Sequence, residues 1–163
     1  MKKITIVGAT GHIGLPLSIL FANKGFKVVG YDINSENVKK VNKGIMLFKE
    51  DNGHKEFKKA RKTNNLNFID KPGDEMKNSD FLITVGTPVD EFMNPELNQL
   101  KKCVDSISPY LNTKSLIILR STVFPGTSEW LKNYLLKRKI KCEVAFCLER
   151  VVQGKTFEEI LFL

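Results

Sequence analysis

Three glycines at regular spacing near the start of the chain point to the binding of an anion. Gly8, Gly11 and Gly14 follow the apolar run of residues 4–7, and an apolar segment with helical spacing comes next. In such a strand-to-helix turn, the first glycine permits the tight turn and the second lets the backbone approach a phosphate. The third allows close packing of helix on strand, and the N–H groups at the helix start attract negative charge. The spacing therefore predicts a pyrophosphate site.

An acidic residue stands where the second apolar run, residues 27–31, comes to its end. Asp32 follows that run, 18 residues beyond Gly14. A carboxylate there accepts hydrogen bonds from the hydroxyls of an adenosine ribose and repels the 2′-phosphate of NADP, so we predict that the cofactor is NAD. The alternative is a plain tight turn with Asp32 capping a helix. One residue more between Gly8 and Gly11 than in the common G-x-G-x-x-G form predicts a slight bulge.

Short β-branched runs alternate with longer segments of helical period, which is typical of repeated strand–helix units in a parallel sheet. We expect strands at residues 4–7, 27–31, 66–69, 81–85, 116–119 and 143–146. We expect helices at residues 15–23, 36–42 and 56–62, from Asn94, and from about Thr127. Gly25 and Gly44 stand where the first two helices should end in a left-handed residue. The pattern predicts the α/β class: one domain over residues 1–163, with a three-layer, doubly wound parallel sheet of the Rossmann type.

The composition fits a globular domain and leaves the kind of anionic partner open. Of the 163 residues, 42% are hydrophobic and 27% charged, and the formal net charge is +8. No apolar stretch approaches the ~20 residues that span a bilayer, and no signal peptide is recognisable, so we expect no membrane association. Three cysteines, an odd number, favour a reducing cytoplasm. His12 and His54 lack partners at metal-ligand spacing, and we expect no metal site.

Four motifs, each at an expected strand end, occur in the order and context of one enzyme family. They are GHIGLPL at 11–17, VGTPVD at 85–90, RSTVFPGT at 120–127 and CLER at 147–150. Together they resemble the nucleotide-sugar 6-dehydrogenases, and within that family the UDP-N-acetylmannosamine dehydrogenase branch, with the UDP-glucose dehydrogenases as relatives. The resemblance covers the chain from residue 4 to about residue 160.

The resemblance implies positions for the two halves of the cofactor. His12, Ile13 and Asp32 would contact the adenosine and pyrophosphate half of NAD, while Thr87 and Thr122 would approach the nicotinamide half. The positions of these residues after the expected strands agree with this assignment, because ligands of open α/β sheets bind beyond the carboxyl ends of the strands. Taken singly, Thr122 could instead be a strand-end hydroxyl that satisfies the backbone.

The resemblance also implies a substrate-facing segment. Glu149, Arg150 and Val151 would lie where the nucleotide sugar meets the cofactor domain, with Thr122 helping to order a water and Glu149 assisting acid–base chemistry or thioester hydrolysis. The alternative for Glu149 and Arg150 is an ion pair on the surface that has no role in function. Leu148 stands where the family usually has proline. The turn that orients Glu149 therefore departs from the family pattern.

In the family, the whole enzyme oxidises a sugar primary alcohol to a carboxylate in two hydride transfers to NAD. The central helix and the second domain, which supplies a nucleophilic cysteine, have no counterpart in these 163 residues, so we expect the chain alone to be inactive, with a homodimer still possible. One alternative is a truncated, catalytically incomplete nucleotide-binding module, and a weaker one is a nucleic-acid-binding protein that uses the basic residues 54–62. The apolar residues 160–163 are expected to lie exposed where a further strand would pair.

Overall fold

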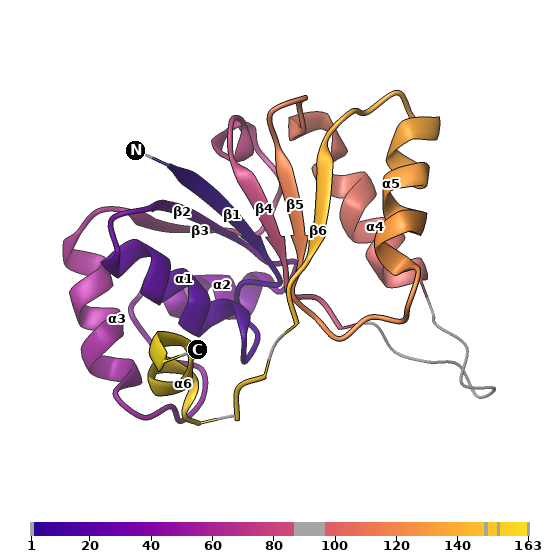
Figure 1. Ribbon diagram of the computed structural model, residues 1–163. Helices are drawn as coiled ribbons and strands as arrows, with labels where there is room; N and C mark the ends of the chain where they lie inside the picture. The colour runs from indigo at the N-terminus through magenta and orange to yellow at the C-terminus, as the bar shows by residue number, and fades with distance from the viewer. Residues whose placement is uncertain (1, 87–96, 149, 153, 163) are drawn as a thin grey trace.

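Six parallel strands form one sheet in the computed structural model, which describes residues 2–86, 97–148, 150–152 and 154–162 (Figure 1). Their order across the sheet is β3-β2-β1-β4-β5-β6, and every pairing is parallel. The strands are β1 (Lys3–Val7), β2 (Lys27–Tyr31), β3 (Leu66–Ile69), β4 (Asp80–Ile83), β5 (Leu116–Leu119) and β6 (Glu143–Phe146). The chain reverses its direction of travel across the sheet between β1 and β4, which is the switch point where doubly wound sheets bind ligands.

Helices cover both faces of the sheet and make the three layers that the alternating pattern predicts (Figure 1). On one face lie α1 (Gly14–Asn23), α2 (Ser35–Asn42), α3 (Gly53–Lys62) and α6 (Thr156–Phe162). On the other lie α4 (Asn98–Ile107) and α5 (Thr127–Lys137). Each face has its own apolar core, one around Ile6, Leu15 and Ile19 and the other around Phe81, Val104 and Leu131. The predicted fold class is confirmed.

Local sequence signals set most of the helix ends. Gly25 and Gly44 adopt φ +87°, the left-handed conformation expected after α1 and α2. The side chain of Asn34 accepts a hydrogen bond from the Asn37 N–H and so caps the start of α2. Helix α5 begins at Thr127 as expected. The helix start expected at Asn94 lies outside the described residues, and the helix that the structure describes there, α4, begins at Asn98 after Leu97.

Two elements have an end that lies two or more residues from its predicted position. Strand β4 ends at Ile83, two residues earlier than expected, because the Thr84 hydroxyl donates to the carbonyls of Val7 at 2.8 Å and Gly8 at 3.2 Å and draws the chain toward the glycine loop. Helix α3 starts at Gly53, three residues earlier than expected, because Gly53 packs as a buried first residue against Met46 and Glu50. Neither difference changes the sheet order.

The C-terminal segment folds as helix α6, so the expectation that residues 160–163 lie exposed for a further strand is wrong for Ile160, which packs against the core. The buried side chain of Glu50 anchors this segment. Its carboxylate accepts hydrogen bonds from the N–H groups of Gly154, at 3.2 Å, and Thr156. The apolar ring of Phe157 is buried beside it. The buried ring of Phe157 and the packing of Ile160 therefore attach this segment to the core of the domain.

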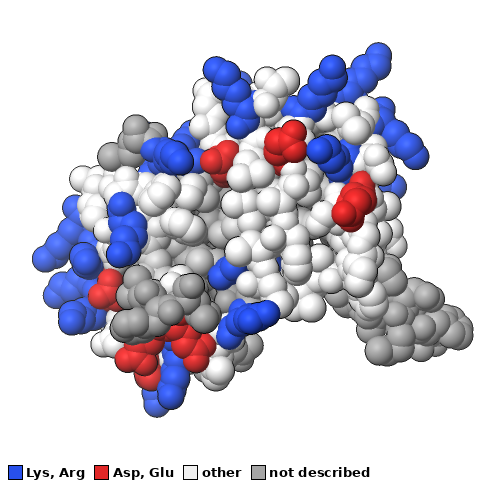
Figure 2. All heavy atoms as spheres, viewed as in Figure 1, with Lys and Arg blue, Asp and Glu red and all other residues white. Residues whose placement is uncertain are grey.

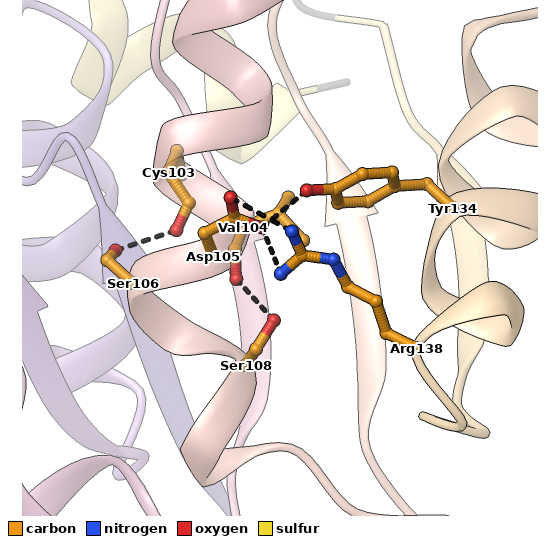
Figure 3. Close-up of polar contacts among 7 residues, drawn as sticks. All are labelled: Cys103, Val104, Asp105, Ser106, Ser108, Tyr134 and Arg138. Atoms are coloured by element: carbon orange, nitrogen blue, oxygen red, sulfur yellow. Dashed lines mark hydrogen bonds and ion pairs between the residues drawn. The ribbon is translucent and has the colours of Figure 1, made fainter.

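A polar clamp joins the two helices on the opposite face (Figure 3). The carboxylate of Asp105 on α4 accepts a hydrogen bond of 2.6 Å from the Tyr134 hydroxyl and pairs with Arg138 at 2.7 Å, both from α5 and its C-terminal end. The Arg138 guanidinium also lies over the Tyr134 ring, 4.5 Å from its centroid. Because these groups lie at the edge of the helix pair, we interpret the clamp as structural.

Candidate functional site

The loop that leaves β1 makes a tight turn at the carboxyl end of the sheet. Gly8 has φ +82°, and the N–H groups of Gly8 and Ala9 both donate to the Tyr31 carbonyl of β2, at 2.9 and 3.1 Å. The Gly11 N–H then donates to the Gly8 carbonyl at 3.1 Å and closes the turn. Two successive N–H groups on one carbonyl break the regular spacing of a parallel ladder, as expected for a loop with one added residue.

Gly14 and Gly11 serve different purposes in this loop. A Cβ on Gly14 would lie 2.2 Å from the Gly8 carbonyl oxygen and 2.8 Å from the Ala9 Cα, so the close approach of α1 to β1 requires glycine. A Cβ on Gly11 would meet the Gly8 oxygen at 3.3 Å and no other described atom within 4 Å, and this residue is exposed. Gly14 is therefore needed by the fold, while Gly11 leaves room above the backbone.

Backbone N–H groups at the start of α1 are available to an anion. Within the described part of the chain, those of His12 and Ile13 meet no protein acceptor. They lie at the N-terminal end of the helix, where the unpaired N–H groups carry partial positive charge. This arrangement offers the kind of N–H donors that the predicted phosphate site needs.

Asp32 is held in a fixed orientation beside the loop. Its Oδ2 accepts hydrogen bonds from the Thr10 N–H at 2.9 Å and the Thr10 hydroxyl at 2.7 Å, while its Oδ1 accepts from the Asn34 N–H at 3.0 Å. The cap of α2 is the Asn34 side chain, so the alternative in which Asp32 caps that helix is wrong. The carboxylate instead joins the glycine loop to the end of β2.

These groups line a cleft of about 830 Å³. One wall is the glycine loop with Asp32, a second is formed by α2 residues that include Lys40, and a third is the segment of residues 45–48. Thr84, Val85 and Gly86 close it at the end of β4. The imidazole of His12 lies against the Phe48 ring, tilted by 32° and with a centroid separation of 4.2 Å. A volume of this size, with a few convergent polar groups, suits a dinucleotide.

Comparison with known proteins identifies the family. Residues 2–162 match the model of the NAD binding domain of the UDP-glucose/GDP-mannose dehydrogenase family. The chain belongs to this family. Among similar proteins, the UDP-N-acetyl-D-mannosamine dehydrogenases of Pyrococcus horikoshii and Methanocaldococcus jannaschii are 33% and 37% identical to it. Each match covers 98% of this chain, but only 39% and 37% of the relative.

Solved structures of the family have the same fold. The structure of the P. horikoshii UDP-D-ManNAc dehydrogenase superposes with a TM-score of 0.89 at 33% identity, over 97% of this chain and 38% of that one. The structure of the UDP-N-acetyl-mannosamine dehydrogenase of Staphylococcus aureus superposes with a TM-score of 0.88 at 30% identity. This match covers 98% of this chain and 39% of that one. The chain thus spans less than two fifths of these relatives and corresponds to their NAD-binding domain, whose cofactor is NAD.

Within this NAD-binding domain, the structure brings together part of the set of residues that the sequence predicts for the cofactor. Gly8, Gly11, His12 and Asp32 all line the cleft. Gly14 is buried beneath the loop, and Ile13 is partly buried and packs against the core. Thr87 lies outside the described residues.

The ends of β5 and β6 lie along the same edge of the sheet but do not line the cleft. Thr122 and Arg150 are exposed and Val151 is partly buried, while Glu149 lies outside the described residues. The Ser121 hydroxyl, next to Thr122, donates to the Val85 carbonyl at 2.5 Å and so ties the end of β5 to the cleft. This bond holds the end of β5 next to Val85, which lines the cleft, and the role of the residues beyond β5 and β6 stays a prediction.

Arg120 connects the ends of β5 and β6. Its guanidinium donates to the Leu148 carbonyl at 3.1 Å and lies 2.8 Å from the Cys147 sulfur. Arg120 therefore holds the segment just after β6 through a hydrogen bond to the Leu148 carbonyl. This contact fixes the direction in which the chain leaves β6.

The three cysteines lie in different environments. Burial raises the pKa of the Cys103 thiol on α4 to about 12, and the pKa of Cys142 is also raised, chiefly by burial and then by the charge of Glu143. Cys147 is exposed. Within the described ranges, no three His, Cys, Asp or Glu side chains gather closely enough to hold a metal ion.

Positive side chains gather over the outer face of α3 and around the C-terminal end of α5 (Figure 2). A shallow basic depression is lined by Gly44, His54, Lys58, Arg61 and Lys62. Part of this charge is structural, because Arg61 donates to the carbonyls of Asn42 and Lys43 at the end of α2. No helix in the described part of the chain has the length and apolar character needed to cross a bilayer.

Sequence reasoning did not find several residues that line the cleft. They are Thr10, Asn34, Asn37, Lys40, Ile45, Met46, Leu47, Phe48 and Thr84. Most come from segments without a motif, and residues 45–48 follow Gly44 in a stretch without helical or strand period. The available signal was an apolar cluster in an otherwise polar loop, which is unusual unless something covers it.

Proposed function

We propose that this domain binds NAD in the cleft at the ends of β1 and β2, with the pyrophosphate on the N–H groups of His12 and Ile13 and the adenosine ribose at Asp32. The observation that carries the proposal is the Asp32 carboxylate, held by Thr10 and Asn34 at the rim of the glycine loop. The exposed face of Gly11 leaves the space that a pyrophosphate needs. Donors, acceptor and space therefore fit the two polar parts of the adenosine half.

In the whole protein, we propose that the domain serves the oxidation of a nucleotide-sugar C6 alcohol to a carboxylate. Bound NAD supplies the hydride acceptor for both oxidation steps. The residues of this chain orient the reactants: the ends of β4 and β5 would flank the nicotinamide, with Thr87 and Thr122 beside it. Thr122 would hold a water near the reacting carbon, and Glu149 would accept or return a proton there.

As substrate of the whole protein we propose a UDP-sugar, and UDP-N-acetylmannosamine is the first candidate. Support comes from the names of the similar proteins and from the position of Arg150 and Val151 beyond β6, on the same edge of the sheet as the cleft. We further propose that residues 1–163 act as one NAD-binding domain in the cytoplasm, in a homodimer, without nucleic-acid or membrane partners. The family match favours NAD over nucleic acid as the partner, and the basic residues of α3 line a depression that is separate from the cleft.

Calorimetric titration of the chain with NAD and NADP tests the cofactor site. We expect NAD to bind, NADP to bind much more weakly, and Asp32→Ala to weaken NAD by about 10- to 100-fold, because it removes a charged acceptor. Glu129→Ala, which removes one exposed negative charge on α5, is the matched control and should leave NAD binding unchanged. Failure of the unmodified chain to bind NAD would refute the proposal.

A second assay follows NADH formation with UDP-N-acetylmannosamine and UDP-glucose. We expect the 163-residue chain to bind NAD without turnover, since the family's nucleophilic cysteine belongs to another domain. Turnover would show that this chain carries a complete site. Binding to an oligonucleotide that weakens steeply with salt and survives Asp32→Ala would favour the nucleic-acid alternative.

A further inference from the structure

Thr10 is one of the two residues between Gly8 and Gly11, and it is buried at the rim of the cleft. Only 5% of its surface is exposed, yet it is polar and lines the cleft beside Asp32. Its N–H and its hydroxyl both donate to one oxygen of that carboxylate, at 2.9 and 2.7 Å. Such a pair of bonds fixes both the position of the carboxylate and the direction of the Thr10 hydroxyl proton.

Counting acceptor sites shows how much of the Asp32 carboxylate remains for a ligand. A carboxylate offers about four lone-pair sites, two on each oxygen. On Oδ2, Thr10 takes both sites, and on Oδ1 the Asn34 N–H takes one. About one site therefore remains on Oδ1, whereas the 2′- and 3′-hydroxyls of a ribose bring two donors.

The second ribose hydroxyl needs another acceptor, and Thr10 provides one. Since its hydroxyl proton is committed to Asp32, the Thr10 oxygen keeps its lone pairs and acts toward a ligand as an acceptor. Asn34 and Asn37 also line this part of the cleft, but the side-chain oxygen of Asn34 is already committed to the α2 cap. Thr10 Oγ1, which donates its proton to Asp32, is thus the acceptor that lies directly beside the carboxylate.

We propose that Thr10 and Asp32 together form the receptor for the adenosine ribose, in which one hydroxyl donates to Asp32 Oδ1 and the other to Thr10 Oγ1. The proposal rests on NAD binding in this cleft. It assigns Thr10 two roles, positioning Asp32 and accepting a ribose hydroxyl. The two hydroxyls then contribute unequally, because a hydrogen bond to a charged carboxylate is stronger than one to a neutral hydroxyl.

The test combines loss of a ligand hydroxyl with loss of the Thr10 hydroxyl. NAD and its analogues lacking the 2′- or the 3′-hydroxyl of the adenosine ribose are titrated into the unmodified chain, Thr10→Val and Thr10→Ser. In the unmodified chain, we expect one analogue to bind about 30-fold more weakly than NAD and the other about fivefold. In Thr10→Val the fivefold difference should disappear, while Thr10→Ser, which keeps the hydroxyl, should preserve both differences.

Two outcomes overturn the proposal. Equal, large losses for both analogues in the unmodified chain would place both hydroxyls on Asp32, and this result needs no variant to fold. Unchanged analogue losses in Thr10→Val would show that Thr10 only packs, because a purely structural role changes the affinity for NAD and its analogues alike. Absence of NAD binding by the unmodified chain is a separate result, which refutes the cofactor site itself.

Discussion

Substitution of Gly14 by alanine separates the structural use of a loop glycine from its use in binding. In the Gly14→Ala variant, the added Cβ would lie 2.2 Å from the Gly8 carbonyl oxygen and 2.8 Å from the Ala9 Cα. Both neighbours are backbone atoms of the turn, which cannot rotate away as a side chain can. Helix α1 must therefore move away from β1.

The size of the effect follows from this geometry. Ordinary contacts between non-bonded heavy atoms lie at roughly 3.5 Å, so the helix start must shift by about 1 Å. Overpacking of this kind costs about 1–3 kcal/mol, and the preference of a helix for alanine returns up to ~1 kcal/mol. We expect a net loss of about 1–2 kcal/mol in the free energy of unfolding, and a Tm lower by about 2–8 °C in a chain of this size.

Thermal unfolding followed by circular dichroism, without NAD, measures this loss. Gly11→Ala is the matched control, because its Cβ would meet only the Gly8 oxygen, at 3.3 Å, and would otherwise face the cleft. That variant should keep its Tm within about 2 °C and yet bind NAD at least about tenfold more weakly, since the methyl group occupies the path of the pyrophosphate. A Gly14→Ala variant as stable as the unmodified chain would refute the packing argument, as would a Gly11→Ala variant that loses equal stability.

Two further predictions concern the C-terminal segment and the thiols. Glu50→Gln should lower the free energy of unfolding by about 1–2 kcal/mol and speed amide exchange at residues 154–156, because one carboxylate oxygen becomes an N–H₂ group facing an N–H donor. The exposed control Glu158→Gln should change neither quantity, and equal behaviour of the two variants would contradict the anchoring role. Alkylation at pH 8, mapped by mass spectrometry, should modify exposed Cys147 before Cys103, whose pKa burial raises to about 12; faster modification of Cys103 would show that α4 opens readily.

The sheet can be predicted from the sequence because its signals are local. The predicted strands at residues 27–31 and 143–146 match β2 and β6 to the residue, since short β-branched runs stand between polar or glycine-containing turns. The ends of α1 and α2 follow from Gly25 and Gly44, where a left-handed residue is needed. Strand β4 is shorter than its prediction because its true end depends on a bond from Thr84 to another strand.

The missing parts of the candidate site depend on contacts between distant residues. Thr10 meets Asp32 across 22 positions, and Glu50 meets Thr156 across 106. Nothing in the types of neighbouring residues shows that an acid in a polar loop will be buried, or that the Phe48 ring will contact His12. Motifs predict the backbone that receives the anion, whereas the side chains that complete the cleft require the fold.

Positive charge and anion binding are separate properties of this domain. The cleft is lined by backbone N–H donors and by few charged groups, with Lys40 the one Lys or Arg among its described lining residues. The lysines and arginines of α3 line a different depression. A pyrophosphate held by fixed N–H dipoles in a partly enclosed cleft needs no lysine, because aligned peptide groups supply the field and lose little entropy on binding. The excess of +8 therefore describes the surface of the domain, whereas the dinucleotide specificity that we propose rests on the turn between β1 and α1 and on the carboxylate that Thr10 holds beside it.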